Sequence, residues 1–236
     1  MFRSRLRLQG MEFVACQSCN QATSTADLVA GFMARLRMED GPHWQNDEAK
    51  KLLAAIKQQV PELWREIFWR DEKAEEIWVR GSNGLIRPLV RIQADGPVLQ
   101  GYLNTFSAKL AMALFREHIG EALPLAGRVM HRWFLNGGLA QTTADTMLRI
   151  LPASGTLRQG RKEHGEQFTY RYNTDDKSIL AALVGFHSNL HVLVVAMSEP
   201  EHYGVLKTWP GAVWSGPGRL LDSMPARRSS SSGSEA

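Results

Sequence analysis

Residues 99–119 of this sequence read LQGYLNTFSAKLAMALFREHI and form its strongest helical pattern. Leu103, Phe106 and Leu110 recur at intervals of three or four residues, which places them on one face of an α-helix. Gly120 follows directly, and glycine is the residue that most often ends a helix in the left-handed conformation. The pattern therefore predicts a long helix with an apolar face that has to pack against another element.

The segments that follow this helix predict an antiparallel sheet. Val192–Ala196 is apolar at every position, which indicates a central strand that is covered on both faces. A helix is expected near Thr143–Leu151, and a polar loop is expected over Pro152–Gly165. The predicted strands span Arg128–Leu135, Gln167–Asn173, Ile179–Phe186 and His191–Ser198.

The segment before the long helix is predicted to form three shorter helices and a hairpin. Ser24 or Thr25 is a candidate cap for the first helix, because a side-chain hydroxyl can accept a hydrogen bond from the first turn. In the hairpin, Gly81–Gly84 is a turn and Pro88 favours an edge position for the second strand. The expected helices span about Thr25–Met38, Asp47–Val60 and Pro61–Phe68, and the expected strands span Ile77–Val79 and Leu85–Ile92.

The composition is that of a globular protein. The chain has 236 residues, a formal net charge of +4 and 44% hydrophobic residues, which excludes wholesale disorder. No run of residues approaches the roughly 18 apolar residues that a membrane helix needs, and the start lacks the apolar stretch of a signal peptide. Two cysteines do not make a disulfide framework in a chain of this size. We therefore expect a soluble, cytoplasmic protein without a membrane partner, and the mildly basic charge permits a polyanionic one.

The only two cysteines, Cys16 and Cys19, form a C-x-x-C motif between a predicted strand, Met11–Ala15, and the first predicted helix. Such a motif can present two thiolates to one tetrahedral zinc ion at Zn–S distances of about 2.3 Å. A closed site needs two more ligands, and the sequence contains no second C-x-x-C. The motif therefore predicts half of a zinc site.

The cysteines have two other interpretations. A thioredoxin-like redox motif requires a strand and a helix before the active strand, but only 15 residues precede Cys16. His187 and His191 have the spacing of the histidine half of a Cys₂His₂ zinc site. They flank a predicted turn far from the cysteines in the sequence, so we expect them to be surface residues of a hairpin.

The residues around the cysteines resemble a known family. Phe13–Ala15 followed by Cys16-Gln-Ser-Cys19-Asn20 is similar to the segment of small bacterial HNH-endonuclease-like proteins in which an apolar strand ends in Ala-Cys-x-x-Cys-Asn. Ser24–Asp27 matches the continuation of that segment loosely. The long helix and the Phe168–Tyr172 strand with the strands after it are also similar to the family's C-terminal part, so the resemblance covers most of residues 11–198.

The resemblance implies a role for each residue of the motif. Cys16 and Cys19 would be two thiolate ligands of a structural Zn²⁺ ion. Asn20 would stand at the last position of the HNH pattern, where a His or Asn side chain helps to hold the catalytic divalent ion, Mg²⁺ or another. That ion would polarise the scissile phosphate while a histidine activates water.

Part of the family pattern has no counterpart in this sequence, namely the upstream C-x-x-C and the Glu-His pair that carries the general base. We therefore expect an incomplete nuclease site with no catalytic residue to assign. The half site is expected to bind zinc weakly or not at all unless another chain supplies ligands. Two alternatives stay open: Met1 is an internal residue of a longer protein, or the chain is a shortened family member that has lost the nuclease.

Arg3, Arg5 and Arg7 give the N-terminus a basic character and are candidate contacts to nucleic-acid phosphates, the alternative being a solvated start with no partner. The predicted fold is α+β, with a partial ββα-metal (HNH-like) motif, a helical middle and a C-terminal antiparallel β-sheet packed on a long helix. The expected function is that of an HNH-like relative of metal-dependent nucleases, and the alternative is a non-enzymatic interaction protein. The predicted units are 1–40 (motif remnant), 41–222 (α+β body) and 223–236 (disordered tail rich in Ser and Arg).

Overall fold

The structure is a computed structural model of the whole chain. It describes residues 17–36, 43–68, 74–80, 84–92, 94–135, 153–155, 158–159, 162–163, 167–187, 189–199 and 211–225. Within these ranges the chain forms four helices, a six-stranded antiparallel sheet and two small two-stranded sheets.

The elements have the following bounds. The helices are α1 (Gln17–Met33), α2 (His43–Gln59), α3 (Pro61–Phe68) and α4 (Pro97–Ile119). The strands are β1 (Ala74–Arg80), β2 (Ile86–Ile92), β3 (Arg128–Leu135), β4 (Ala153–Gly155), β5 (Arg158–Gln159), β6 (Lys162–Glu163), β7 (Phe168–Thr174), β8 (Ile179–Phe186), β9 (Leu190–Met197) and β10 (Val213–Ser215). The large sheet has the strand order β10-β3-β9-β8-β7-β4, β1 pairs with β2, and β5 pairs with β6.

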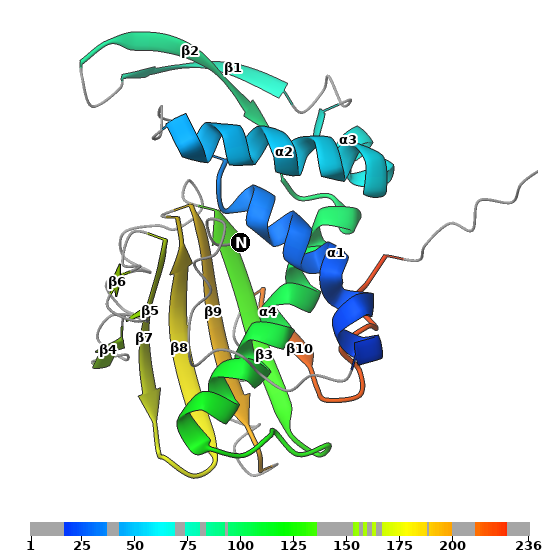
Figure 1. Cartoon of the computed structure of the whole chain (residues 1–236), viewed down its shortest axis with the longest axis vertical. Coiled ribbons are helices and arrows are strands. Elements are labelled where there is room, and N and C mark those ends of the chain that lie inside the picture. Colours follow the sequence, from blue (N-terminus) through cyan, green and yellow to red (C-terminus); the bar gives the residue numbers. More distant parts are fainter. Residues whose placement is uncertain are drawn as a thin grey trace, which may run out of the picture.

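The helices lie on one face of the large sheet (Figure 1). Helix α4 crosses that face and packs against β3, β9 and β8, while α1 packs on α4. Helices α2 and α3 lie beyond α1, and the β1–β2 hairpin extends past them at the end of the molecule. The predicted α+β class, with an antiparallel sheet packed on the long helix, is confirmed.

Helix α4 forms where the sequence predicts it, and it is buried on more sides than the pattern indicates. Pro97 occupies the first turn, and Gly120 ends the helix with a φ of 85° and an N–H that donates to the Arg116 carbonyl at 2.8 Å. Thr105 and Ser107 are buried as well, and their hydroxyls donate to carbonyls four residues earlier in the helix, at 3.0 and 2.7 Å. Because these hydroxyls are satisfied internally, α1 and the sheet can cover α4 from both sides.

The start of α4 is capped from another helix. Both carboxylate oxygens of Glu66, on α3, accept hydrogen bonds from the Val98 and Leu99 N–H groups at 2.9 and 2.8 Å. A Cβ at Gly96 would overlap the Glu66 carboxyl group, so the close approach requires glycine there. The cap satisfies two of the N–H groups that a helix start leaves without an internal partner, and it places a negative charge at the positive end of the helix dipole.

Strand β9 is the central strand that the apolar run predicts. It lies between β3 and β8 in the sheet, and its residues are buried on both faces. Val192 and Val194 belong to the main core with the helices, whereas Leu193 and Val195 belong to small clusters on the opposite face. The prediction of a central strand is confirmed.

The β1–β2 hairpin is also confirmed. Trp78 lies opposite Pro88 in a two-stranded sheet, in which both strands are edges. Exposed apolar side chains gather on the hairpin: Trp78 is 68% exposed, Leu85 is 67% exposed and Ile86 is 60% exposed. The hairpin thus presents an apolar surface to solvent.

Helix α1 differs from its prediction at both ends. It begins at Gln17 rather than at about Thr25, and it ends at Met33 rather than at Met38. Ser24 and Thr25, the residues proposed as caps, lie inside the helix instead: the Ser24 hydroxyl donates to the Gln21 carbonyl at 2.7 Å, and Thr25 is buried. The neighbouring Thr23 hydroxyl donates in the same way to the Cys19 carbonyl at 3.0 Å. Hydroxyls that bind carbonyls three or four residues earlier are compatible with a helix interior, which explains why the cap prediction was wrong.

Other predictions fail where pairing between distant segments decides the structure. The predicted polar loop over residues 152–165 contains β4, β5 and β6. Strand β4 forms because β7 offers it free backbone N–H and C=O groups at the edge of the sheet. Strand β10 was not predicted, and it pairs with β3 at the other edge. Helix α2 begins at His43 rather than at about Asp47. The predicted helix over 143–151 and the predicted strand over 11–15 lie outside the described residues.

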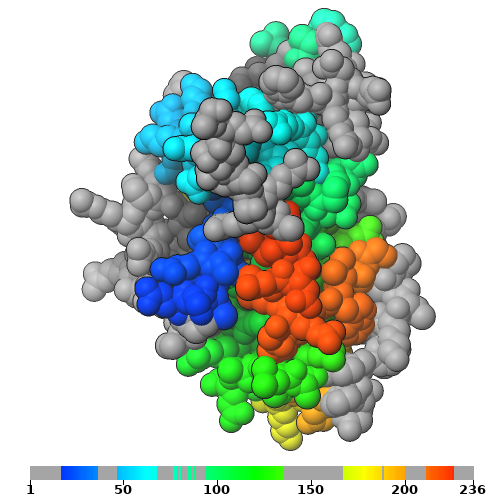
Figure 2. Space-filling view, turned by 90° about the vertical axis from the view of Figure 1, so that its right-hand side faces the viewer, coloured from blue at the N-terminus to red at the C-terminus, as the bar shows by residue number. Residues whose placement is uncertain are grey.

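Residues 223–225, the first residues of the predicted disordered tail, are part of the fold. A Cβ at Gly101, on α4, would overlap the Ser223 carbonyl and would lie 3.0 Å from Pro225 Cδ, so residues 223–225 lie directly on α4. Figure 2 shows residues 211–225 (orange to red) seated beside α1 (blue) on one face of the molecule. The prediction of disorder from residue 223 is therefore wrong for 223–225, and residues 226–236 lie outside the description.

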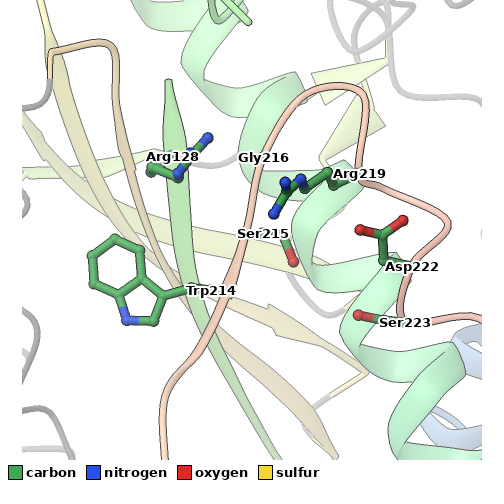
Figure 3. Close-up of a pocket in the computed structure, with 7 residues that line it drawn as sticks. All are labelled: Arg128, Trp214, Ser215, Gly216, Arg219, Asp222 and Ser223. Atoms are coloured by element: carbon green, nitrogen blue, oxygen red, sulfur yellow. The ribbon is translucent and has the colours of Figure 1, made fainter. Parts of the chain in front are cut away.

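The alternation along β10 directs neighbouring side chains to opposite sides of the sheet. Trp214 packs with Met130 and Val195 on the face away from the helices. Ser215 points to the other side, away from Trp214 (Figure 3), and its Oγ lies 3.0 Å from His131 Nε2. The described residues 17–36 share one hydrophobic core with α4 and the sheet, so this part of the predicted 1–40 unit has no core of its own.

The cap on α4 leads to a prediction. Glu66→Gln replaces a carboxylate that accepts two hydrogen bonds with an amide that has one acceptor oxygen, and it removes the charge at the helix start. We expect a loss of about 1 kcal/mol of unfolding free energy in urea denaturation. Glu121→Gln, at an exposed position after α4, is the control and is expected to change stability by less than about 0.5 kcal/mol. Equal stabilities of the two variants would contradict the cap.

Candidate functional site

The cysteine motif lies at the start of α1. Cys19 is the third residue of the helix, Asn20 is the fourth, and both are exposed. Cys16 directly precedes the helix in the sequence and lies outside the described residues, as do Arg3, Arg5 and Arg7. The prediction that the motif lies between a strand and the first helix is therefore wrong for Cys19 and Asn20, which are helical.

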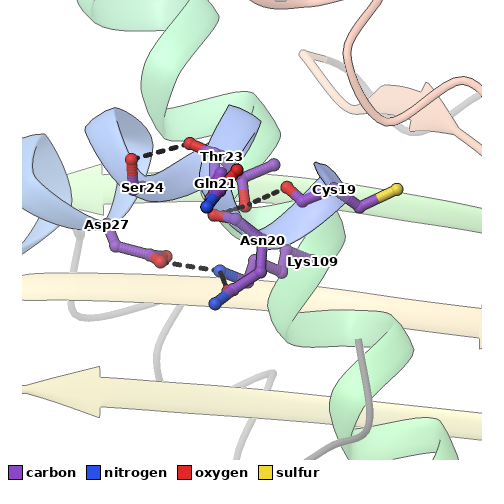
Figure 4. Close-up of polar contacts among 7 residues, drawn as sticks. All are labelled: Cys19, Asn20, Gln21, Thr23, Ser24, Asp27 and Lys109. Atoms are coloured by element: carbon purple, nitrogen blue, oxygen red, sulfur yellow. Dashed lines mark hydrogen bonds and ion pairs between the residues drawn. The ribbon is translucent and has the colours of Figure 1, made fainter. Parts of the chain in front are cut away.

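The Asn20 side chain contacts α4 (Figure 4). Its Oδ1 accepts a hydrogen bond from Lys109 Nζ at 3.3 Å, and the same Nζ forms an ion pair with Asp27 Oδ2 at 2.6 Å. An ammonium group therefore lies at the oxygen that the resemblance assigns to a divalent cation. A metal ion on this oxygen would have to displace Lys109 against the repulsion of like charges.

The other end of α1 is held by two polar side chains. Asn189, in the turn between β8 and β9, donates from Nδ2 to the Met33 carbonyl at 2.6 Å. Arg35 donates to the Gly31 carbonyl at 3.0 Å and forms an ion pair with Glu48 at 2.8 Å. Burial lowers the pKa of the Arg35 guanidinium, while the Glu48 carboxylate opposes that shift. These contacts satisfy terminal carbonyls of α1 and fix the helix in the core, so that its first turn is presented on a rigid element.

The two histidines considered as zinc ligands lie at the wrong end of α1. They flank the turn whose Asn189 binds Met33, whereas Cys19 lies in the first turn of this 17-residue helix. A helix of that length spans about 25 Å. The predicted hairpin is confirmed, but His187 is only 1% exposed and is not the surface residue that was expected. Within the described ranges, no group of three or more His, Cys, Asp or Glu side chains is arranged to hold a metal ion.

Sequence reasoning missed a buried histidine–serine contact. His131, on β3, is 0% exposed, and its Nε2 lies 3.0 Å from the Ser215 Oγ on β10. Burial lowers the pKa of His131 to about 4, so the ring is neutral near pH 7. His131 pairs directly with Val213, and Ser215 is two residues farther along the same face. His131 and Ser215 are 84 positions apart in the sequence, so no local sequence pattern relates them. Only the pairing of β10 with β3 could reveal this contact.

Comparisons with known proteins found no relative. No protein-family model, no curated protein and no solved structure matched this chain. None of the helices in the described ranges is long and apolar enough to cross a membrane.

The buried histidine leads to a pH prediction. Between pH about 6.5 and about 4 the unfolded chain binds a proton at His131 that the folded chain does not bind, so stability falls as the pH decreases through this range. The loss is about 3 kcal/mol, from 1.4 kcal/mol for each unit of pKa difference. His131→Gln removes the titrating group, and we expect a smaller decrease in its unfolding free energy from pH 7 to pH 4, measured in urea. The same decrease in both proteins would contradict the assignment.

Proposed function

We propose that this protein is a nucleic-acid-binding relative of HNH endonucleases, whose own 236 residues supply only part of a nuclease centre. The observation that supports this proposal most directly is the exposure of Cys19 and Asn20 in the first turn of a helix whose other end is fixed in the core. A helix start that is exposed and rigidly held is where the resemblance puts the metal-binding part of the motif.

The two thiols are the residues that fit a metal ion. Cys16 and Cys19 are three apart, which is about one turn of a helix, and the positive end of the helix dipole favours thiolates there. A bound Zn²⁺ ion would supply folding stability by linking the segment before α1 to the helix. Asn20 is already engaged by Lys109, so in this proposal its side chain helps to position α1 on α4.

The proposed contact to nucleic acid is electrostatic. Arg3, Arg5 and Arg7 precede the motif in the sequence with no acidic residue between them. Arginine contacts to phosphates provide affinity that does not depend on base sequence. Because the Glu-His pair is missing, the centre has no general base. The proposal is therefore that this chain binds nucleic acid but does not cleave it by itself.

The zinc proposal is tested with the full chain and a cobalt titration, because Co²⁺ bound to thiolates absorbs light. We expect a weak thiolate–cobalt signal that Zn²⁺ displaces and that is absent from Cys16→Ser and Cys19→Ser. Gln21→Ala, an exposed change on the same helix, is the control and should keep the signal. An unchanged signal in both serine variants would contradict the assignment of these thiols.

The nucleic-acid proposal is tested by fluorescence anisotropy with DNA and RNA oligonucleotides over a range of salt concentrations. Replacing Arg3, Arg5 and Arg7 together with Gln should lower the slope of log affinity against log salt by about 3, which corresponds to three lost phosphate contacts. Arg65→Gln, an exposed change on α3, is the control. No binding at low salt would contradict the proposal, and plasmid nicking that depends on a divalent ion would contradict the statement that the centre is incomplete.

A second candidate function is that of a non-enzymatic interaction protein. The exposed apolar side chains of Trp78, Leu85 and Ile86 on the β1–β2 hairpin favour it, because exposed apolar groups that gather on one surface mark interaction sites. The two candidates predict different results in the anisotropy experiment: an interaction protein of this kind would not bind oligonucleotides through its N-terminal arginines.

A further inference from the structure

A pocket outside the cysteine motif lies where β10 and the turns after it meet the start of β3. Its volume is about 180 Å³, and its lining includes Arg128, Ser215, Gly216, Arg219 and Asp222. For comparison, a cavity of about 150 Å³ can hold benzene. The pocket is therefore large enough for a phosphate group together with a small part of the molecule that carries it.

The buried histidine determines where the Ser215 hydroxyl can donate. His131 Nδ1 is buried and has no hydrogen-bond partner in the part of the chain that is described. A buried N–H without a partner is costlier than a buried lone pair without one, so the ring hydrogen is favoured on Nε2. His131 then donates to Ser215 Oγ at 3.0 Å. The hydroxyl hydrogen of Ser215 is left to donate to a group in the pocket.

Two guanidinium groups add positive charge. Arg128 donates to the Gly127 carbonyl at 3.2 Å, and Arg219 is exposed on the turn after β10. Neither forms an ion pair with a residue of the described ranges. Figure 3 shows the Arg219 side chain directed from that turn towards Ser215. Charged donors without an acidic partner are suited to bind an anion.

Gly216 makes room for this arrangement. It is buried, and a Cβ at this position would lie 3.1 Å from Arg128 Nη1 and 3.2 Å from the Gly127 carbonyl oxygen. At the edge of the sheet, the side chains of Arg128 and Ser215 extend from opposite faces. Both line the pocket, because Gly216 has no side chain that would separate them. A larger residue would press on the guanidinium.

Asp222, which is exposed, adds an acceptor to the lining, and Ser223 also lines the pocket. Two guanidinium groups and one carboxylate leave a net charge of +1 at neutral pH. The carboxylate would accept a hydrogen bond from a hydroxyl group on the ligand, and it would repel a second negative charge nearby. The lining therefore matches a ligand that combines one anionic group with a neighbouring hydroxyl.

We propose that Arg128, Ser215 and Arg219 form a binding site for a phosphate group. A phosphate presents oxygens in several directions, which suits donors that come from β3, from β10 and from the following turn. The phosphate has two plausible sources, a small phosphate monoester and a nucleic-acid chain. This inference does not depend on the cysteine motif or on the N-terminal arginines.

The test is a calorimetric titration of the full chain with three probes: inorganic phosphate, a nucleoside 5′-monophosphate and a single-stranded oligonucleotide. Arg219→Gln should weaken binding of the preferred probe about tenfold or more, because a charge-assisted contact is lost. Arg65→Gln makes the same charge change on α3 and should leave the affinity unchanged. A thermal melt of each variant checks folding, and Arg219 is exposed, so its replacement leaves the core intact.

Further variants test the individual roles. Ser215→Ala should weaken binding about fivefold through the lost hydroxyl donor. Gly216→Ala should weaken binding by displacing Arg128. Asp222→Asn should strengthen the binding of inorganic phosphate several-fold, because it removes a negative charge beside an anion.

The relative affinities of the three probes distinguish the two sources of the phosphate. Tighter binding of the monophosphate than of the oligonucleotide would identify a small monoester, and the reverse would identify a nucleic-acid phosphate. Either result supports the site if Arg219→Gln reduces it and Arg65→Gln does not. The proposal is overturned if none of the three probes binds at millimolar concentration, or if Arg65→Gln and Arg219→Gln have equal effects.

Discussion

The burial of α4 on several sides is the constraint on which the rest of the structure depends. A helix covered by α1 on one side and by the sheet on the other is fixed in place, and its terminal N–H and C=O groups still need partners that the helix itself does not supply. Glu66 of α3 therefore caps its start, and Gly120 closes its end with a left-handed turn. The positions of α1 and α3 and the path of residues 223–225 are all set by contact with this one helix.

The same constraint shapes the start of α1, where the cysteine motif lies. Lys109 of α4 contacts both Asn20 and Asp27, so the polar side of α1 is tied to the buried helix at a point close to Cys19. At the far end, Asn189 and Arg35 bind the last carbonyls of α1. Cys19 and Asn20 thus belong to a helix that shares the main core. In this geometry the Asn20 amide serves the packing of α1 on α4.

The two regions proposed to bind anionic partners differ in how they are built. The N-terminal arginines stand at alternate positions near the start of the sequence, so the sequence alone shows that this segment is basic. The pocket of Arg128, Ser215 and Arg219 is assembled from residues that are distant in the sequence and that meet only because β10 adds to the edge of β3. Ser215 contacts a buried neutral histidine, His131, whose charged form would be unfavourable away from water.

Local sequence patterns were enough to predict α3, α4, the β1–β2 hairpin, β3 and the central strand β9. In each of these, the period of apolar residues and a nearby Gly or Pro agree with the final structure. The start of α1 was predicted wrongly, because Ser24 and Thr25 serve equally well as caps or as interior residues, and local sequence does not distinguish the two. The sequence identified the C-x-x-C motif but not the surroundings of Asn20, because Lys109 reaches it from another helix. Tertiary structure alone decided the His131–Ser215 contact, the pairing of β4 and β10 and the pocket, because backbone pairing at a sheet edge is hardly encoded in the side chains of short strands.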